Sequence, residues 1–393
     1  MTRKAAFVAS VYRHFDLFHV PVMEMLQREG YEVHAFAEDD YAKVRLQERG
    51  IICHDIPIAR SPLKWSNISA ARLLISHFKR EQFQLLHVHT PVASILGRIA
   101  GRVANVPAVL YTAHGFHFYK GAPLPFWMLY YPVERVMSSW TDALITINRE
   151  DFDRASNEFS ADEVLYVPGV GVDIERFAPE NTSVAKARIR AELNIAEDEH
   201  LVVCVAELND NKNQMQLIEA LPHLPSHLKV RCLLVGVGEH DVLLKKRAEE
   251  LGVADSLHLL GYRLDVPDLI AASDVCTLLS KREGLPRFLL EAMATGRPIL
   301  ATNIRGSRDL VQDGETGYLV PVGDSLATAN ALERLLADEE LRGEMGRTIR
   351  ERVAPYRTEN VVRELQGIYA DVLRKKQSHT QGEAAVGRGG LSS

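Results

Sequence analysis

The chain has 393 residues, of which 46% are hydrophobic and 25% charged, and its formal net charge is −6. This length exceeds what one ordinary core supports and predicts two globular domains. The acidic balance argues against a dedicated nucleic-acid-binding protein, since such proteins are usually basic. No apolar run reaches the ~20 residues of a membrane-spanning helix, and the N-terminal run is too short for a secretion signal. Four scattered cysteines agree with reduced thiols in a cytoplasmic protein.

In the first half of the chain, short apolar runs alternate with helical patterns. A helix is expected near residues 19–30, ending at Gly30. The predicted strands are 5–10, 31–37, 85–90, 108–114 and 142–148. Such alternation predicts a doubly wound, mostly parallel sheet.

The same rhythm restarts after a stretch rich in glycine and proline, residues 167–183, which we interpret as a linker. The second set of predicted strands is 200–208, 230–236, 256–262, 274–280 and 298–303. We therefore expect two α/β domains in tandem, with the binding site in the cleft that they form. The expected bounds are 1–172 and 173–355, a helix at about 356–376 that packs back on the first domain, and a disordered tail at 377–393.

Histidines follow two successive strands of the first domain. "HVHTP" (87–91) ends one strand, and "TAHGFHFYKG" (112–121) ends the next with His114 and His117. Polar residues beside glycine at the carboxyl ends of strands are typical of functional groups in α/β domains. The alternative is that these histidines cap strands or fill gaps in the core.

Lys212 lies in "AELNDNKNQ" (206–214), directly after the first strand of the second domain. A lysine beside helix N-terminal amides is a natural phosphate ligand, although the alternative is a solvated lysine at a helix start. No Walker-type glycine pattern is present, so ATP hydrolysis is not expected. The glycines of "VGVGE" (235–239) lack the spacing of a dinucleotide fingerprint.

The stretch "KREGLPRFLLEAMATGRPIL" (281–300) combines an amphipathic helix with charged residues. Glu283 precedes the helix, Pro286 is expected in its first turn, and Glu291 lies about a turn and a half inside. The amides of the helix N-terminus, together with Arg287, predict binding of an anion such as phosphate. The two carboxylates could then hold sugar hydroxyls on either side of that phosphate.

Residues 283–324, "EGLPRFLLEAMATGRPILATNIRGSRDLVQDGETGYLVPVGD", resemble the signature of family 4 glycosyltransferases. That signature has two glutamates separated by seven residues, followed by a loop ending in Gly-Tyr-Leu-Val. The match runs through the whole chain except the tail. "FHVPVMEMLQREGYEVHAFA" (18–37) and "HGFHFYKGAP" (114–123) resemble the bacterial subgroup that builds lipid-linked capsular, exopolysaccharide or O-antigen units.

The resemblance implies the GT-B fold, in which two Rossmann-like doubly wound domains face each other across a cleft. It also implies that Lys212 binds the donor diphosphate and that Glu283 and His114 contact the donor sugar as catalytic residues. Glu291 would hold the ribose hydroxyls. The remaining donor contacts implied are Gly284, Leu285, Tyr262 and Arg263. Family members retain anomeric configuration and usually need no metal or other cofactor, which fits the absence of an Asp-x-Asp motif at a strand end.

One position departs from the family. Many relatives have Gly-Arg-Leu where this chain has Ala206, Glu207 and Leu208, so an arginine that flanks the diphosphate is missing. We hypothesise that Arg287, where relatives often have a small residue, replaces the lost cation. The alternative is a surface arginine beside an acidic loop.

The acceptor is expected on the first domain. Residues 60–83 alternate basic and apolar side chains, and "APLPFWMLYYP" (122–132) is unusually aromatic for a surface connection. Such segments suit an anionic membrane surface or a lipid carrier, although the alternative is a helix whose aromatics pack on the sheet. The acceptor-side candidates are His19, His117, Lys120, Trp127 and Tyr130.

By the family resemblance, the expected function is transfer of a hexose or N-acetylhexosamine from a nucleotide-diphosphate sugar, expected to be a UDP-sugar, to a polyprenyl-diphosphate-linked saccharide in surface polysaccharide biosynthesis. The protein would work at the cytoplasmic face of the cell membrane as a peripheral protein. The rivals are a sugar-nucleotide epimerase or a phosphorylase of the same fold and a non-catalytic binding subunit.

Overall fold

The computed structural model describes residues 2–177 and 182–389 and divides the chain into two compact units. Unit 1 comprises Met1–Val170 together with Thr358–Ser393, and unit 2 comprises Gly171–Arg357. The sequence had placed these boundaries after residues 172 and 355 rather than 170 and 357. The chain thus leaves unit 1, forms unit 2 and returns to unit 1.

Unit 1 is built on a seven-stranded sheet of order β3-β2-β1-β4-β5-β6-β7, in which every neighbouring pair is parallel. The strands are β1 Arg3–Val11, β2 Tyr31–Glu38, β3 Ile52–Asp55, β4 Leu85–His89, β5 Ala108–Ala113, β6 Ala143–Thr146 and β7 Glu163–Tyr166. The chain builds outward from β1 in one direction and then from β4 in the other. This is the doubly wound arrangement, with its switch point between β1 and β4.

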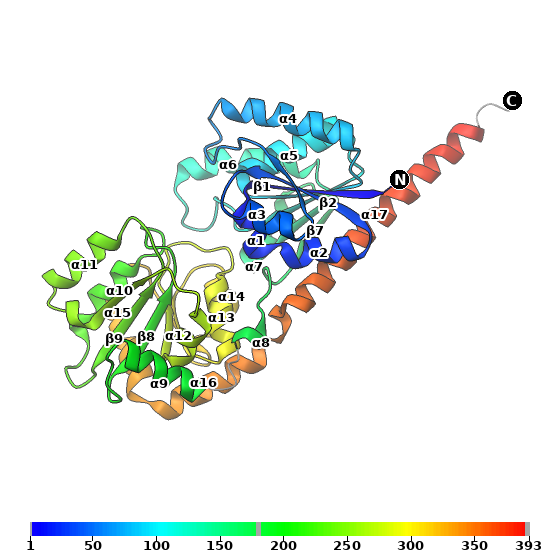
Figure 1. Ribbon diagram of the computed structural model, residues 1–393. Coiled ribbons are helices and arrows are strands. Elements are labelled where there is room, and N and C mark those ends of the chain that lie inside the picture. The colour runs from blue at the N-terminus through cyan, green and yellow to red at the C-terminus, as the bar shows by residue number, and fades with distance from the viewer. Residues whose placement is uncertain (1, 178–181, 390–393) are drawn as a thin grey trace. The chain divides into compact units, whose positions relative to one another are not determined.

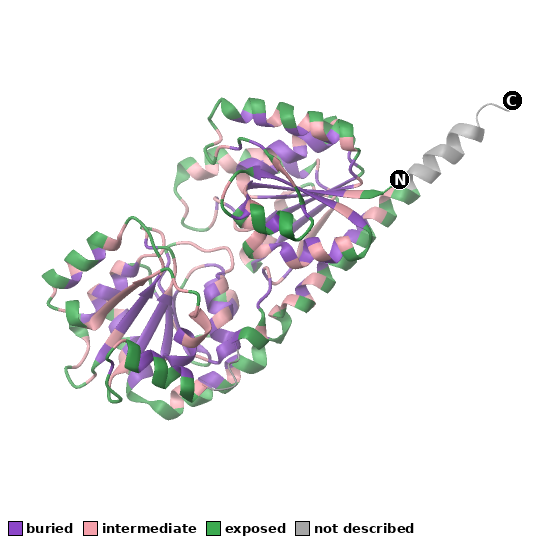
Figure 2. Cartoon of the chain, viewed as in Figure 1, coloured by how far each residue is buried: buried purple, intermediate pink, exposed green. Residues whose placement is uncertain are grey.

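Helices cover both faces of this sheet (Figure 1). They are α1 Tyr12–Phe18, α2 Val20–Arg28, α3 Lys43–Glu48, α4 Ser66–Glu81, α5 Pro91–Val103, α6 Leu124–Ser138, α7 Arg149–Glu158 and α17 Thr358–Gly389. One core cluster joins the sheet to α1, α2, α3 and α17, and a second joins the opposite face to α4 and α5. Figure 2 shows the result: the central strands are buried and the outer helix faces exposed.

Unit 2 repeats the plan with six parallel strands of order β10-β9-β8-β11-β12-β13. The strands are β8 His200–Val205, β9 Val230–Val235, β10 Leu257–Gly261, β11 Val275–Leu278, β12 Ile299–Thr302 and β13 Gly317–Val320. The helices are α8 Ile174–Phe177, α9 Thr182–Glu192, α10 Gln214–Ala220, α11 Asp241–Glu250, α12 Val266–Ala272, α13 Arg287–Thr295, α14 Ser307–Leu310, α15 Ser325–Ala337 and α16 Glu339–Arg352. Short 3₁₀ turns are Leu221–His223, Ala254–Ser256 and Ala354–Tyr356. The switch point lies between β8 and β11.

Several elements differ from the sequence prediction. The single helix expected at 19–30 is two helices that meet at His19, and Pro21 lies in the first turn of α2. The aromatic connection at 122–132 belongs to α6, which contains Pro132. Gly-Tyr-Leu-Val, read as the end of a loop, is strand β13. Cys204, Cys232 and Cys276 are buried and unpaired, as expected of reduced core thiols.

The C-terminal helix begins at Thr358 and packs against α2 through a buried stripe that includes Val361, Leu365 and Tyr369. Disorder was expected from Gln377, but α17 continues to Gly389, and residues 390–393 lie outside the described residues. A helix that is nucleated by packed turns propagates through polar residues at little cost. Among the described residues, no helix is both long enough and apolar enough to cross a membrane.

Candidate functional site

The switch point of unit 2 brings together two predicted donor-site residues. The loop after β8 carries Lys212, and the loop after β11 carries Glu283. Because β8 and β11 are neighbours, the side chains meet: Lys212 Nζ lies 2.5 Å from Glu283 Oε1, and both are partly buried. A lysine and a carboxylate held at the carboxyl ends of adjacent parallel strands form a polar site where α/β sheets bind ligands.

Asparagines hold the two loops in place. Asn211 Nδ2 donates to Arg282 O at 3.0 Å, and Asn213 Nδ2 donates to Leu279 O at 3.0 Å. Asn213 also adopts a left-handed backbone conformation, with φ of 53°, just before α10. The asparagine-rich run around Lys212 therefore fixes the position of the lysine relative to Glu283, a role that the sequence alone did not reveal.

The glycines of "VGVGE" serve close backbone packing. A Cβ atom on Gly236 would lie 2.1 Å from Ala206 O, and one on Gly238 would lie 2.1 Å from Leu208 O. These contacts let the loops after β8 and β9 run side by side, linked by the hydrogen bond from Leu208 N to Val237 O at 3.1 Å. The glycines thus support the loop that carries Glu207 and Lys212.

Helix α13 presents Arg287 and Glu291 at its N-terminal end. Pro286, expected in the first turn, is the N-cap, and Gly296 ends the helix in a left-handed conformation, as predicted. Arg287 Nε lies 3.2 Å from Glu291 Oε1, one helical turn away. Burial raises the pKa of Glu291, and the nearby Arg287 opposes that rise.

The loop between Glu283 and α13 contains Gly284 and Leu285, two of the residues predicted to contact the donor. Gly284 is half-buried, and its carbonyl oxygen would lie 2.2 Å from a Cβ atom on Gly306. Leu285 is also half-buried and packs against the core of unit 2. The loop is therefore held in place by the packing of Leu285 on the core and by the close approach of Gly284 to Gly306.

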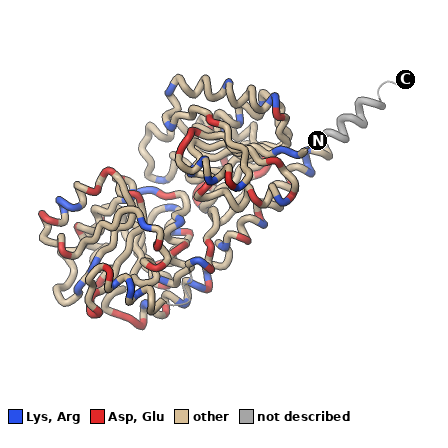
Figure 3. Tube along the Cα trace, in the orientation of Figure 1, with Lys and Arg blue, Asp and Glu red and all other residues tan. Residues whose placement is uncertain are grey.

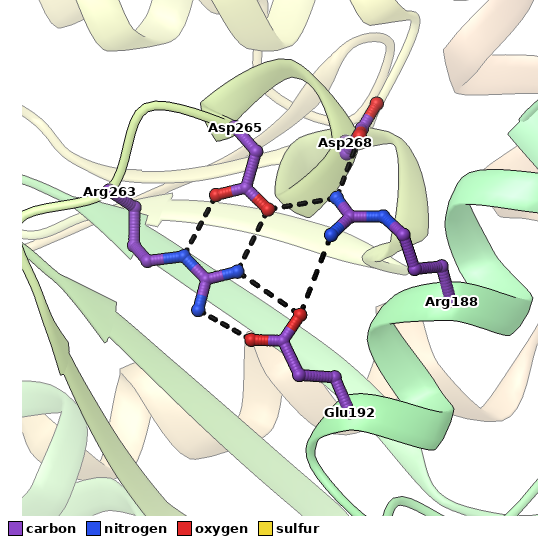
Figure 4. A network of polar contacts seen from close by, with 5 residues as sticks. All are labelled: Arg188, Glu192, Arg263, Asp265 and Asp268. Atoms are coloured by element: carbon purple, nitrogen blue, oxygen red, sulfur yellow. Dashed lines mark hydrogen bonds and ion pairs between the residues drawn. The ribbon is translucent and has the colours of Figure 1, made fainter.

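Tyr262 and Arg263 follow β10 and have different environments. The Tyr262 side chain is 75% exposed. Arg263 makes four hydrogen bonds, two to Glu192 and two to Asp265, and Figure 4 shows this network extending to Arg188 and Asp268. Arg263 lowers the pKa of Asp265 well below its ordinary value. The guanidinium of Arg263 is thus engaged by carboxylates of its own unit, a set that sequence reasoning missed because Glu192 is 71 residues away.

In unit 1, four histidines gather at the switch point between β1 and β4. His14 lies in α1, directly after β1, and His19 separates α1 from α2. His89 ends β4 opposite Thr112 of β5, which places it close to His114. His14 Nε2 and His19 Nε2 are 3.3 Å apart, as are His89 Nδ1 and His114 Nε2.

Burial lowers the pKa of all four histidines, that of His114 to about 4, so the rings are neutral near pH 7. The sequence had singled out His114 and His19 but assigned no role to His14. Its position directly after the first strand was the signal that could have found it.

The acceptor-side candidates lie on α6 and the loop before it. His117 stacks on Tyr130 with ring centroids 4.4 Å apart, and Lys120 is exposed. Trp127 is half-buried and packs on Phe118. This agrees with the alternative, given by the sequence, in which the aromatic side chains of this helix pack against the rest of the domain. The exposed face of α6 is formed instead by aliphatic residues, including Leu124 and Met128.

Two family models match the chain. That of the glycosyl transferases group 1 covers residues 185–352, and that of glycosyl transferase 4-like proteins covers residues 6–148. EpsD of Bacillus subtilis (strain 168), which carries a provisional glycosyltransferase name, is 38% identical over 385 residues, covering 96% of this chain and 100% of that protein. The UDP-Gal:alpha-D-GlcNAc-diphosphoundecaprenol alpha-1,3-galactosyltransferase of Escherichia coli is 30% identical over 368 residues, covering 90% of this chain and 92% of that protein.

Among solved structures, Anabaena Alr3699/HepE in complex with UDP and glucose matches with a TM-score of 0.79 and 18% identity, covering 94% of this chain and 100% of that one. At this identity the likeness shows the fold alone, the GT-B fold of two Rossmann-like domains. The paired doubly wound sheets, the two family models and the full-length relatives agree. The chain therefore belongs to the group 1, or family 4, glycosyltransferases.

Proposed function

We propose that this protein transfers a hexose or N-acetylhexosamine, with retention of configuration, from a UDP-sugar to a saccharide linked to a polyprenyl diphosphate. The observation that carries the proposal is the Lys212–Glu283 pair at the switch point of unit 2. Its support is a relative of 30% identity whose name specifies UDP-Gal and GlcNAc-diphosphoundecaprenol. The product would enter the biosynthesis of a surface polysaccharide.

The ion pair explains how the site changes when a donor binds. Without a donor, Glu283 neutralises the ammonium group of Lys212. A diphosphate would take over Lys212 and free the Glu283 carboxylate to accept hydrogen bonds from the donor sugar. Lys212 and Glu283 thus exchange one contact with each other for two contacts with the substrate. This exchange favours binding of a molecule that carries both a diphosphate and a sugar.

Charge stabilisation of the leaving nucleotide would come from protein groups. Lys212, Arg287 and the N-terminal amides of α13 supply positive charge, and Glu291 would hold the ribose hydroxyls. His114 would contact the donor sugar from unit 1. Because these cations and amides neutralise the diphosphate, the proposed reaction needs no metal, and we expect transfer to persist in EDTA.

Peripheral membrane contact is part of the proposal. Leu63 and Trp65, which precede α4, are 79% and 85% exposed. The neighbouring exposed basic residues are Arg60, Lys64, Arg72, Lys79 and Arg80. Figure 3 shows basic positions, in blue, along the α4 segment. Exposed apolar side chains beside Lys and Arg favour binding to an anionic lipid surface. Such a surface would carry the lipid-linked acceptor.

The membrane contact is tested by sedimentation with anionic liposomes at low salt. Replacing Leu63 and Trp65 with serine should release most of the protein into the supernatant. The matched control is Val242→Ser on α11 of unit 2, an apolar side chain that is 76% exposed and whose replacement should leave binding unchanged. Equal sedimentation of all three proteins, or no sedimentation of the wild type, would refute peripheral binding.

Thermal melting with UDP- and GDP-sugars tests the donor site. A bound donor raises the apparent stability by mass action, so UDP-sugars should raise Tm for the wild type and not for Lys212→Ala. The decisive assay then measures UDP release with and without a GlcNAc-diphospho-polyprenol acceptor. Acceptor-dependent release with an α-linked product supports transfer, whereas epimerisation of the free sugar nucleotide without an acceptor would favour the epimerase alternative.

A further inference from the structure

The segment of unit 2 that carries Glu283 runs from residue 279 to residue 286, between β11 and α13. Four of its carbonyl groups accept hydrogen bonds from side chains of neighbouring segments. The bonds are 2.5–3.0 Å long and run from Asn213 Nδ2 to Leu279 O, from Thr302 Oγ1 to Ser280 O, from Asn211 Nδ2 to Arg282 O, and from Arg305 Nε to Glu283 O. Side chains thus fix a stretch of backbone that belongs to neither the strand nor the helix.

Arg305 differs from the other three donors because it carries a charge. It is only 4% exposed, and its Nε donates to Glu283 O at 3.0 Å. Burial of a guanidinium group costs free energy that a buried amide or hydroxyl group does not cost. A hydrogen bond from a charged donor is also stronger than one from a neutral donor. The most strongly held carbonyl of the segment is therefore that of Glu283 itself.

Gly306, the residue after Arg305, allows the two loops to lie this close together. Its φ of 76° is in the left-handed region that favours glycine. A Cβ atom on Gly306 would lie 2.2 Å from Gly284 O and 3.3 Å from Leu285 Cα. Because that atom is missing, the loop after β12 packs directly on the backbone after Glu283, and Arg305 reaches the Glu283 carbonyl.

We propose that Arg305 is a positioning residue that holds Glu283 where its carboxylate meets the donor sugar. The inference rests on the proposed function, in which Glu283 contacts the sugar and Lys212 contacts the diphosphate. In that function the diphosphate takes Lys212 away from Glu283, so the carboxylate loses its 2.5 Å contact with Lys212 Nζ. The bond from Arg305 to the main chain of Glu283 does not involve Lys212. Arg305 therefore keeps Glu283 in place while the Glu283 side chain changes partner.

The four donors come from two sides of the segment. Asn211 and Asn213 flank Lys212, so their bonds tie the segment to the loop that carries the lysine. Thr302 and Arg305 belong to the end of β12 and the loop after it, to which no donor contact is assigned. Arg305 thus attaches Glu283 to a part of unit 2 that a bound donor leaves undisturbed.

Loss of Arg305 should affect recognition of the sugar and spare recognition of the nucleotide. Calorimetric titration of the full-length chain should show that Arg305→Met binds UDP within about twofold of the wild type, and a UDP-sugar about tenfold more weakly, the effect of losing one hydrogen bond. Its kcat should fall about 10- to 100-fold, because a displaced carboxylate no longer meets the reacting sugar. Arg305→Lys should recover most of both losses, because an ammonium group can still donate a charged hydrogen bond to the carbonyl.

Arg308→Met is the matched control. It removes a guanidinium group from the same stretch of chain, but Arg308 is exposed and its Nη1 donates to Asn303 instead of Glu283. Both ligands should bind to Arg308→Met as they bind to the wild type. Equal weakening of UDP and UDP-sugar binding in Arg305→Met would overturn the proposal, because general damage to unit 2 affects both ligands alike.

Hydrogen–deuterium exchange without any ligand tests the support of Glu283 independently of activity. Peptides that cover residues 279–286 should take up deuterium faster in Arg305→Met than in the wild type and in Arg308→Met, with Arg305→Lys between them. Arg305→Lys serves for the comparison if Arg305→Met does not fold. Unchanged uptake in the variants of Arg305 would overturn the proposal. A wild type that binds no nucleotide sugar would refute the proposed function instead, and the exchange result would still decide whether Arg305 holds Glu283.

Discussion

Glu207 lies where the family resemblance implies an arginine, and its side chain is exposed in the loop before Lys212. A carboxylate there repels a diphosphate, and Lys212 then provides the nearest cation of that loop. Arg287 is the first residue of α13, directly after the loop that carries Glu283, and it is paired with Glu291. Replacement of the missing arginine by Arg287 would require this side chain to serve both the phosphate and Glu291.

We expect Arg287→Ala to lower kcat/KM for the donor about 10- to 100-fold, the effect of losing a charge-assisted hydrogen bond. Lys212→Ala should lower kcat about 100- to 1,000-fold, because the lysine would stabilise charge that develops as the nucleotide leaves. Steady-state kinetics with a varied UDP-sugar measure both effects. Arg334→Ala, an exposed arginine on α15, is the control and should change neither parameter.

The hypothesis that Arg287 replaces the missing cation is tested further by a double variant that combines Arg287→Ala with Glu207→Arg. Glu207→Arg should restore most of the activity lost in Arg287→Ala, because it returns the cation to its usual position. Unchanged kinetics for Arg287→Ala would show that this arginine is a surface residue beside an acidic loop. Failure of Glu207→Arg to rescue would show that Arg287 acts only through Glu291.

Gly238 allows two backbone segments to approach each other closely because it has no side chain. A Cβ atom there would lie 2.1 Å from Leu208 O, a distance that requires movement of the backbone. We expect Gly238→Ala to lower the free energy of unfolding of unit 2 by more than about 2 kcal/mol. Gly343→Ala on α16, where the nearest atom would be 3.7 Å away, should raise it by up to about 1 kcal/mol.

Urea unfolding followed by far-ultraviolet circular dichroism measures both variants. Tryptophan fluorescence should not change its midpoint in either, because the tryptophans lie in unit 1. A stable Gly238→Ala protein with wild-type donor affinity would show that the two loops can separate without consequence.

At the scale of elements, α5 and α6 are joined by a buried ion pair. Arg98 is fully buried and donates to Glu134 Oε2 at 2.7 Å, and Glu134 also accepts from the Tyr111 hydroxyl at 3.2 Å. Burial and the neighbouring Glu134 raise the pKa of Tyr111. The pair fixes α6, the helix that carries Trp127 and Tyr130, to the rest of unit 1.

Arg98→Ala should therefore cost about 3–5 kcal/mol of stability, because it leaves the Glu134 carboxylate buried without its cation. The double variant with Arg98→Met and Glu134→Leu should lose less than the single variant, since it removes both charges and keeps apolar volume. Trp127 and Trp140 fluorescence in urea reports unit 1 directly. A double variant as unstable as Arg98→Ala would indicate that lost packing, rather than the unpaired charge, sets the cost.

The elements that the sequence predicted well are those with long apolar runs. β1, β2, β4 and β5 lie within three residues of their predicted bounds because buried parallel strands are continuously apolar. β3 and β7, four residues each and largely outside the core, have no such run and were missed. The break between α1 and α2 was missed because the apolar pattern continues through His19.

The candidate site shows the same difference between features that depend on local sequence and features that depend on distant segments. The sequence names Lys212, Glu283 and Glu291 as candidates because local motifs carry them, and the structure brings Lys212 and Glu283 into contact. The histidine cluster was found only in part, because it depends on β1 lying beside β4, which are separated along the chain by β2 and β3. The engagement of Arg263 with Glu192 likewise depends on a contact between distant segments. Local patterns therefore specified the two loops that carry Lys212 and Glu283, and long-range pairing determined the surroundings of those loops.

At the scale of the whole molecule, the two units differ in how their histidines respond to pH. Burial lowers the pKa of eight histidines in unit 1, that of His54 to about 4 and that of His87 to about 3. The others are His14, His19, His34, His77, His89 and His114. In unit 2 a lowered pKa is found for His200 and His258.

Because these pKa values lie below the ordinary value of about 6.5, the unfolded chain binds more protons than the folded one once the pH falls below that value. The stabilising contribution is complete above pH 6.5 and is lost progressively as the pH falls toward the folded pKa values. His87 alone, which is fully buried, should contribute a slope of up to about 1.4 kcal/mol per pH unit between about pH 6 and pH 3. We therefore expect unit 1 to lose stability in mild acid before unit 2.

Urea titrations between pH 8 and pH 4.5 in EDTA test this expectation. The fluorescence midpoint, which reports unit 1, should stay constant above pH 7 and fall steeply below pH 6, while the circular-dichroism signal should separate into two transitions as unit 1 unfolds first. His34→Gln should reduce the steepness in unit 1 because it removes one of the protons taken up. Equal acid sensitivity of both transitions would contradict the assignment, since the neutral buried histidines of unit 1 could not then be the groups that bind protons on unfolding.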